Sequence, residues 1–359
     1  MPWNTNTNRE SPMRAAVFLG AGRLEIQDVP DPAITRADQA IIRVEANGLC
    51  GSDVHALDVP PGRPFAPGVI LGHEYSGVVS ECGEQAGVAV GDRVAVMPNV
   101  PCGQCLQCRL GRPNLCANPG VFGSLRGPHD WPGGAAELAI APASCLFRVP
   151  DDVPLDVAAL AEPLACVVNA CNRLSLSPGT SVLILGAGPI GLMAMLLALG
   201  AGANPVIVAE TLPARAKVAK ALGAHLVVDP NSENLADAVR DLSPGGADNV
   251  VDAVGSLLHV AVDAAAAGGR IVIVGVNEHV APPVPAFAIV QKELTIAGSW
   301  VIRHTFPTAL RLLAQPGLGL DRLITHRVPL EDTARAIDML RSGEAVKALV
   351  MPGLRPDRA

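Results

Sequence analysis

The stretch Ser181-Val-Leu-Ile-Leu-Gly-Ala-Gly-Pro-Ile-Gly191 runs an apolar strand pattern into a glycine-rich turn, and the helical pattern of Leu192–Leu199 follows it. Gly186 allows a sharp turn, Gly188 has no side chain to keep a phosphate away from the backbone, and Gly191 allows helix and strand to pack closely. The helix N-terminus would then bind the phosphates of a dinucleotide. The candidate cofactor-binding residues of this turn are Gly186, Gly188, Pro189, Ile190 and Gly191.

The residues after the turn extend this prediction. The next strand pattern ends at an acid, Glu210, about twenty residues after the last glycine, which is the spacing of a carboxylate that binds the adenosine ribose. Strand and helix patterns then alternate to about residue 299, and this alternation predicts a right-handed, doubly wound parallel sheet of the α/β class. The expected strands are Val182–Leu185, Val206–Ala209, Leu226–Val228, Asn249–Ala253, Arg270–Val274 and Leu294–Ser299.

Composition excludes several classes of protein. The 359 residues suffice for two domains, and 49% hydrophobic content indicates a globular chain. A net charge of -7 without a dense lysine or arginine cluster argues against nucleic acid as a partner. Leu174–Ala209 carries no charge, but glycines and prolines divide it into pieces too short to cross about 30 Å of hydrocarbon, so we expect no membrane span.

The two ends of the chain carry different patterns. Residues 1–12 are polar, without the apolar core of a secretory signal, and are expected to form a flexible tail; Met13 is a candidate for the true start. Short strands are expected at Ala15–Leu19, Gln39–Ala46, Gly77–Glu81 and Asp92–Val96, as in an irregular β-rich unit. Beyond residue 300, helices are expected at Phe306–Leu313 and Leu330–Ser342, and a last strand, Ala348–Met351, is expected to return to the first domain.

Four cysteines lie close together in the β-rich part. The run Cys102-Gly-Gln-Cys-Leu-Gln-Cys-Arg-Leu-Gly-Arg-Pro-Asn-Leu-Cys116 places four thiolates within reach of one tetrahedral ion, with no position left for a substrate. Such a closed site is structural. The alternative is a pair of disulfides, which the absence of an export signal disfavours, and the same reasoning predicts a reducing, cytoplasmic location. The predicted ligands of this structural zinc are Cys102, Cys105, Cys108 and Cys116.

A second set of candidate ligands is spread along the chain. Cys50 lies among turn residues, and His73 with Glu74 follows about twenty residues later; a thiolate with an imidazole suits zinc. Glu162 is the only charge between Val157 and Val168, and an isolated carboxylate in such a segment costs several kcal/mol unless it is paired or metal-bound. The alternative for Cys50 is a buried thiol, and for either glutamate a buried salt bridge, for instance with Arg43 or Arg93.

Taken together, these motifs resemble those of the zinc-dependent medium-chain dehydrogenases, in particular their polyol, butanediol and threonine dehydrogenase branch. The similarity covers nearly the whole chain from Met13 onward. It rests on the four-cysteine run and on the segments Gly48-Leu-Cys-Gly-Ser-Asp-Val-His55, Leu71-Gly-His-Glu74, Ala161-Glu-Pro-Leu164 and Gly186-Ala-Gly-Pro-Ile-Gly191.

The resemblance implies a Rossmann cofactor domain inserted in a GroES-like, β-rich catalytic domain. The expected division is a tail (1–12), a catalytic domain (13–160) with a structural-zinc lobe at about 98–120, an NAD-binding domain (161–299) and a return to the catalytic domain (300–359). By resemblance, a catalytic zinc is bound by Cys50 and His73, with Glu74 or Glu162 as third ligand. Two zinc ions per chain, NAD and a homodimer or homotetramer are also implied.

The activity implied is oxidation of a secondary alcohol, such as a polyol, cyclitol, diol or 3-hydroxy amino acid, to the ketone. In the family a zinc-bound alkoxide forms, its proton leaves through the positions of Ser52 and His55, and a hydride passes to NAD. A non-catalytic NAD-binding sensor and an NADPH-linked carbonyl reductase are the alternatives. Short-chain dehydrogenase chemistry is excluded, because the only tyrosine is Tyr75 and no Tyr-x-x-x-Lys motif is present.

Two departures from the family pattern bear on specificity. Sorbitol dehydrogenases carry an aromatic-Arg-Tyr sequence where this chain has Trp300-Val-Ile-Arg-His304, which argues against sorbitol. The ribose acid is Glu210 where relatives often have aspartate; a carboxylate repels a 2'-phosphate and so favours NAD. The nearby Arg215 leaves some use of NADP open.

Overall fold

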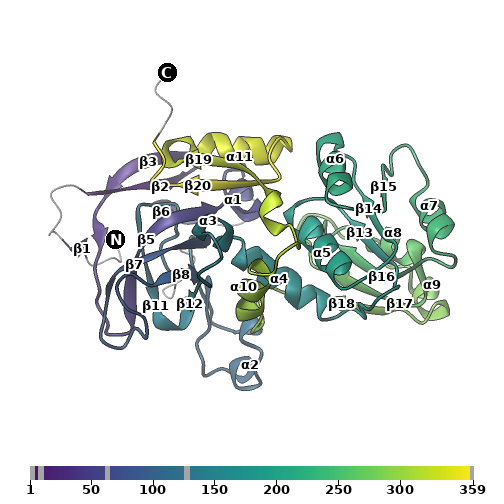
Figure 1. The fold of residues 1–359 in the computed structure, drawn as a ribbon, viewed down its shortest axis with the longest axis horizontal. Coiled ribbons are helices and arrows are strands. Elements are labelled where there is room, and N and C mark those ends of the chain that lie inside the picture. Colours follow the sequence, from purple (N-terminus) through teal and green to yellow (C-terminus); the bar gives the residue numbers. More distant parts are fainter. Residues whose placement is uncertain (1–4, 7–11, 61–64, 125–129, 356–359) are drawn as a thin grey trace. The chain divides into compact units, whose positions relative to one another are not determined.

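The computed structural model describes residues 5–6, 12–60, 65–124 and 130–355 (Figure 1). The chain divides into two compact units. Unit 1 comprises residues 1–162, 306–314 and 324–359, and unit 2 comprises residues 163–305 and 315–323. Of the expected tail, residues 1–4 and 7–11 lie outside the described residues, whereas Thr5–Asn6 form β1, which pairs with β4 (Asp31–Pro32).

Unit 2 is built on a six-stranded parallel sheet with the order β15-β14-β13-β16-β17-β18. The predicted doubly wound sheet is thereby confirmed, although β16 and β17 begin earlier than expected. The strands are β13 (Val182–Leu185), β14 (Val206–Ala209), β15 (Leu226–Val228), β16 (Ala247–Asp252), β17 (Ala265–Ile273) and β18 (Thr295–Gly298). The helices are α4 (Ala161–Cys171), which begins in unit 1, α5 (Pro189–Gly200), α6 (Pro213–Ala221), α7 (Leu235–Leu242), α8 (Leu258–Ala264), α9 (Ala286–Gln291) and the short η3 (Leu320–Leu323).

The strand order of this sheet reverses at β13. The chain moves outward from β13 to β14 and β15 and then returns to the other side of β13 with β16. Every residue of β13 and β14 is buried, as expected for strands covered on both faces. Doubly wound sheets bind their ligands at the carboxyl ends of the strands where the order reverses, and the glycine turn lies at that end of β13.

Unit 1 is rich in β-structure. Its main sheet has the order β12-β8-β7-β5-β20-β19, with β11 also paired to β5, and smaller sheets are β3-β2-β6 and β10-β9. The strands are β2 (Met13–Gly20), β3 (Arg23–Val29), β5 (Gln39–Gly48), β6 (Val69–Ile70), β7 (Glu74–Cys82), β8 (Arg93–Val96), β9 (Asn99–Val100), β10 (Gly120–Val121), β11 (Leu138–Pro142), β12 (Leu146–Arg148), β19 (Ile324–Pro329) and β20 (Lys347–Met351). The helices are α1 (Gly51–Ala56), α2 (Leu106–Arg109), α3 (Leu155–Ala158), α10 (Phe306–Leu313) and α11 (Thr333–Ser342), with short 3-10 turns η1 (Pro113–Leu115), η2 (Ala143–Cys145) and η4 (Leu330–Asp332).

The C-terminal segment completes the sheet of unit 1. Strand β20 pairs antiparallel with β5, placing Leu349 opposite Gly48, and β5 pairs on its other side with β7. Figure 1 shows β19, β20 and α11 beside the N-terminal strands. The last strand therefore lies in the sheet of unit 1. In the part of the chain that the structure describes, no helix is both long and apolar enough to cross a membrane.

Candidate active site and metal centres

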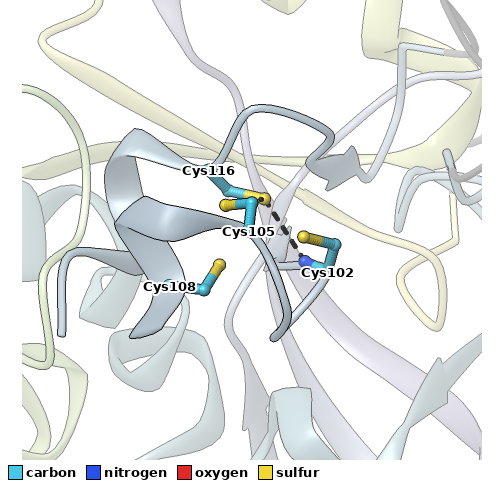
Figure 2. Close-up of side chains that lie close together, drawn as sticks. All are labelled: Cys102, Cys105, Cys108 and Cys116. Carbon is cyan, nitrogen blue, oxygen red and sulfur yellow. Dashed lines mark hydrogen bonds between the residues drawn. The ribbon is translucent and has the colours of Figure 1, made fainter. Parts of the chain in front are cut away.

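The four cysteines of the 102–116 run lie together. Their sulfur atoms all lie within 4.8 Å of one another. Figure 2 shows the side chains of Cys102 and Cys108 directed toward those of Cys105 and Cys116. The backbone N–H of Cys102 donates to Sγ of Cys116 at 3.3 Å. Backbone N–H groups of Ala117 and Cys108 lower the pKa of Cys105 to about 6, whereas burial and the neighbouring thiols raise the pKa of Cys108 to about 12. The thiolate that binds metals is therefore most favoured at Cys105.

The second group of candidate ligands is formed by Cys50, His73 and Glu74. Their ligand atoms also lie within 4.8 Å of one another. Cys50 is the N-cap of α1, and the buried carboxylate of Asp53 accepts its backbone N–H at 2.9 Å, which fixes the cysteine at the start of the helix. His73 directly precedes β7, and Glu74 is its first residue. Segments twenty residues apart therefore converge on one point.

The electrostatics of this group favour a cation. Desolvation lowers the pKa of His73, but its hydrogen bond with Cys50 and the charges of Cys50, Asp53 and Glu162 outweigh that effect and hold the pKa well above its usual value. An environment that favours a protonated imidazole also favours a metal ion in the same place. A thiol, an imidazole and a carboxylate form a donor set typical of zinc with an open fourth position, so the residues present fit this metal.

The salt-bridge partner of Glu74 was not among those suggested by the sequence. Its Oε2 pairs with Nζ of Lys347, and both side chains are almost fully buried. Arg43 pairs instead with Glu45, and Arg93 donates to backbone carbonyls, so neither arginine neutralises Glu74. Sequence reasoning missed Lys347, although its place in the apolar run Ala345–Met351 is the same kind of signal that singled out Glu162.

Glu162 lies in the first turn of α4 and is buried, with 8% of its surface exposed. It is not a member of the group that brings Cys50, His73 and Glu74 within 4.8 Å. Its charge nevertheless contributes to the raised pKa values of His73 and Lys347. Glu162 is therefore close enough to influence the group electrostatically, while Glu74 is the carboxylate that the described geometry joins to Cys50 and His73.

The two residues of the expected proton relay lie on α1. Ser52 and His55 are three residues apart, which places them on one face of the helix. Nδ1 of His55 lies 3.0 Å from Oδ2 of Asp58, and 60% of the His55 side chain is exposed. Asp58 is also held by Nη2 of Arg341 at 3.3 Å. The imidazole is thus fixed on one side and open to solvent on the other.

The glycine turn adopts the conformation that its glycines suggest. Gly186 has φ +92, and a Cβ at Gly191 would overlap the carbonyl oxygen of Gly186. Gly188 is the N-cap of α5, and Pro189 and Ile190 are the first helical residues. Pro189 has no N–H to leave unsatisfied at this position. The turn therefore presents the helix N-terminus at the carboxyl end of β13.

Glu210 follows β14 directly and reaches back to the turn. Its Oε2 accepts the backbone N–H of Ala187 at 2.7 Å, and its Oε1 accepts those of Thr211 and Leu212, both at 2.8 Å. The carboxylate thus ties the glycine turn to the loop before α6. Arg215, on α6, lies near Gly188, and its buried Nε has no hydrogen-bond partner within the described residues.

A cavity of about 840 Å³ lies in another part of unit 1. It is lined by residues of β2, β3, the segment 30–39 and the start of the four-cysteine run. The guanidinium of Arg36, one of the lining residues, lies over the ring of Trp131. None of Cys50, His73 and Glu74 is among its lining residues. The cavity is therefore distinct from the candidate active site.

Comparison with known proteins agrees with this arrangement. Residues 36–151 match the model of the alcohol dehydrogenase GroES-like domain, and residues 189–315 match that of the zinc-binding dehydrogenases. The chain is 32% identical over 345 residues to sorbitol dehydrogenase of Bombyx mori, covering 94% of this chain and 97% of the relative. It is 34% identical over 351 residues to L-threonine 3-dehydrogenase of Pyrococcus horikoshii, covering 94% and 97%.

A solved structure shows the same similarity. A zinc-binding dehydrogenase from Sinorhizobium meliloti, bound to NADP, matches with a TM-score of 0.89 and 33% identity, over 96% of this chain and all of that one. The fold and the matched domains define an alcohol dehydrogenase with a GroES-like domain and a Rossmann domain. The chain belongs to the zinc-dependent medium-chain dehydrogenase family, as the sequence motifs predicted. It is accordingly an oxidoreductase that uses zinc and a nicotinamide cofactor.

Proposed function

We propose that this dehydrogenase oxidises a secondary alcohol of the polyol, cyclitol, diol or 3-hydroxy amino acid type to the ketone, with NAD as hydride acceptor. The observation that carries the proposal is the convergence of Cys50, His73 and Glu74 within 4.8 Å. The names of the similar sorbitol and threonine dehydrogenases support this range of substrates. The segment Trp300–His304 departs from the aromatic-Arg-Tyr pattern and argues against sorbitol itself.

In this proposal Cys50, His73 and Glu74 hold the catalytic zinc, with Glu162 close by. When bound, zinc acts as a Lewis acid that makes the substrate hydroxyl more acidic. The four-cysteine cluster holds a second, structural zinc, since four thiolates leave no open position. Ser52 and His55 carry the hydroxyl proton toward solvent, because His55 is exposed and its ring is oriented by Asp58.

The glycine turn holds the phosphates of the cofactor. The N-terminus of α5 is exposed to a ligand because Gly188 carries no side chain, and the backbone N–H groups there favour an anion. Glu210 favours NAD, since its carboxylate repels a 2'-phosphate; three backbone donors leave it about one further acceptor position for a ribose hydroxyl. The bound nicotinamide supplies the hydride acceptor.

The test is NADH formation by zinc-loaded enzyme with threonine, 2,3-butanediol, sorbitol, other polyols, inositols and simple secondary alcohols. Cys50→Ser is expected to abolish turnover and leave NAD binding nearly intact. Cys82→Ser is the matched control, because Cys82 is a free cysteine outside both metal groups. Turnover retained in Cys50→Ser, or equal loss in Cys82→Ser, would contradict the assignment.

A second candidate is an NADPH-linked carbonyl reductase on the same scaffold. The observation that favours it is Arg215, whose guanidinium lies beside Gly188 with a buried Nε that lacks a partner within the described residues. A guanidinium in that position suits a phosphate. The two candidates are distinguished by kcat/KM for the two cofactors: an equal or higher value with NADP would overturn the preference for NAD.

We also propose a homodimer or homotetramer and a cytoplasmic location. Support for assembly comes from exposed apolar side chains on and just before α9, where Val284, Phe287 and Val290 are 64%, 78% and 74% exposed. The α9 helix precedes β18, the last strand in the order of the parallel sheet. Phe287 and Val290 are three residues apart on α9 and so share one face of the helix, and exposed apolar patches are typical of interfaces. A reducing compartment is supported by the need of both cysteine-containing sites for free thiolates.

A further inference from the structure

A buried lysine lies directly behind the candidate catalytic metal site. Lys347 is the first residue of β20, and only 1% of its surface is exposed. Its ammonium forms an ion pair with Oε2 of Glu74 and donates to the backbone carbonyl of Leu49 at 2.9 Å. Leu49 directly precedes the candidate ligand Cys50. Glu74 is itself a candidate ligand and directly follows His73. One ammonium therefore holds a ligand and the residue next to another ligand.

The absence of a side chain at Gly48 leaves space for this ion pair. Gly48 lies opposite Glu74 on β7 and opposite Leu349 on β20. A Cβ at Gly48 would overlap Oε2 of Glu74 and come within 3.1 Å of Cε of Lys347. A side chain at this position would therefore displace the ion pair, and the glycine keeps the space for it.

The negative charge of the site also favours a buried cation. The site contains three buried carboxylates, Asp53, Glu74 and Glu162, in addition to the thiol of Cys50. The ammonium of Lys347 offsets part of this negative charge through its ion pair with Glu74. Buried carboxylates without such a partner are strongly destabilising.

We propose that Lys347 is the positioning residue of the catalytic metal site: it takes one oxygen of Glu74 and thereby presents the other to the ion. This inference rests on the proposed function, because it assumes a zinc at Cys50, His73 and Glu74. Partners that orient metal ligands typically contribute about 10- to 100-fold to metal affinity or activity. The lysine itself contacts neither substrate nor metal.

Zinc retention of the full-length chain against increasing chelator tests this role. Native mass spectrometry counts the ions, and Cys50→Ser gives the count without the catalytic zinc. Lys347→Met is expected to lose that zinc at about 10- to 100-fold lower free chelator than the unmodified enzyme, while the zinc of the four-cysteine site remains. Lys347→Arg, which keeps the charge, is expected to recover part of the loss. Retention by Lys347→Met equal to that of the unmodified enzyme would overturn the proposal.

The matched control is Lys292→Met. Lys292 also holds backbone carbonyls, those of Val262, Asp263 and Ala265 at 2.8–2.9 Å, but it pairs with no candidate ligand. Its loss is expected to lower the melting temperature and leave zinc retention unchanged. Equal zinc loss in both variants would mean that general destabilisation, rather than positioning, explains the effect.

A double-mutant cycle keeps the test decisive if Lys347→Met folds poorly. The pair Glu74→Gln and Lys347→Met removes both charges, and if Lys347 acts through Glu74, the second change adds little to the zinc loss caused by Glu74→Gln alone. Additive losses would contradict the proposal. Failure of the proposed function is recognised separately, because an unmodified chain that binds no zinc beyond the count of Cys50→Ser refutes the catalytic site itself.

Discussion

Replacing Gly188 with alanine separates cofactor binding from folding. Gly188 has φ -71 and ψ 178, an extended conformation that alanine adopts readily. A Cβ built there meets only Nη1 of Arg215, at 3.9 Å, which is ordinary contact. The folded protein therefore accommodates the methyl group. A phosphate that approaches the backbone of the turn would collide with the same methyl group.

The magnitudes follow from these contacts. Gly→Ala at a compatible position stabilises by about 0.4–1 kcal/mol through the unfolded chain, and alanine is worse than glycine at an N-cap by a similar amount, roughly 0.5–1 kcal/mol. The free energy of unfolding should therefore change by no more than about 0.5 kcal/mol. Cofactor affinity should fall at least about tenfold, or about 1.4 kcal/mol, because the phosphates lose their approach to the helix N-terminus.

Gly191→Ala provides the contrast within the same turn. A Cβ at Gly191 would overlap the carbonyl oxygen of Gly186 and come within 3.2 Å of Cγ2 of Ile184, so α5 must shift away from β13. Overpacking of this kind costs about 1–3 kcal/mol. Urea unfolding measures stability, and calorimetric titration with NAD measures affinity. If Gly188→Ala binds NAD as tightly as the unmodified enzyme, or loses as much stability as Gly191→Ala, the reasoning is refuted.

Three further outcomes are expected. The backbone N–H of Ala89 and the side chain of Arg148 lower the pKa of Asp92. The stabilisation by Asp92 is therefore present above the unfolded pKa of about 3.9 and is lost as the pH falls below it. The difference in melting temperature between Asp92→Asn and the unmodified protein should close in acid, and a constant difference would contradict this. Phe287→Glu should lower the molar mass measured by light scattering, and an unchanged mass would exclude this face as the interface. Asn169 donates to the carbonyls of Trp300 and Val301, the latter at φ +39, so Asn169→Ala should cost about 1–3 kcal/mol in urea unfolding; no loss would show that the bonds do not stabilise this segment.

Most strands of the parallel sheet could be predicted to within one or two residues at each end, and the reason is local. Strands buried on both faces read as continuous apolar runs. Serine and proline precede these two strands and glycine and a charge follow them, so Val182–Leu185 and Val206–Ala209 have the predicted bounds. At Ala265–Ile273 the strand begins before the expected Arg270, because Ala265–Gly269 lacks the branched residues by which a strand is recognised.

The candidate ligands could be predicted for a different reason. The four-cysteine run stands out by the spacing of its residues. Cys50 taken alone is equally consistent with a buried thiol, and it is the isolated glutamates and the four-cysteine run that favour a metal ligand at Cys50 and His73. Glu74 and Glu162 stood out as isolated charges in apolar segments, but the sequence left open which of them joins Cys50 and His73. Only the pairing of β5 with β7 brings Glu74 into the group.

The partner of Glu74 could not be predicted, because it depends on a contact between residues 273 positions apart. Lysine in a sequence is most often solvated, and Lys347 begins an apolar strand where an exposed position would be equally consistent with the pattern. The order of strands explains why Lys347 is buried. Strands β20 and β7 pair with opposite edges of β5, and Gly48 on β5 leaves room for the side chains of Lys347 and Glu74. A buried lysine at that point is stable only because Glu74 is already there, and Glu74 is stable only because of the lysine. The C-terminal strand therefore does more than close the sheet: it supplies the charge that allows a carboxylate to be buried beside Cys50 and His73.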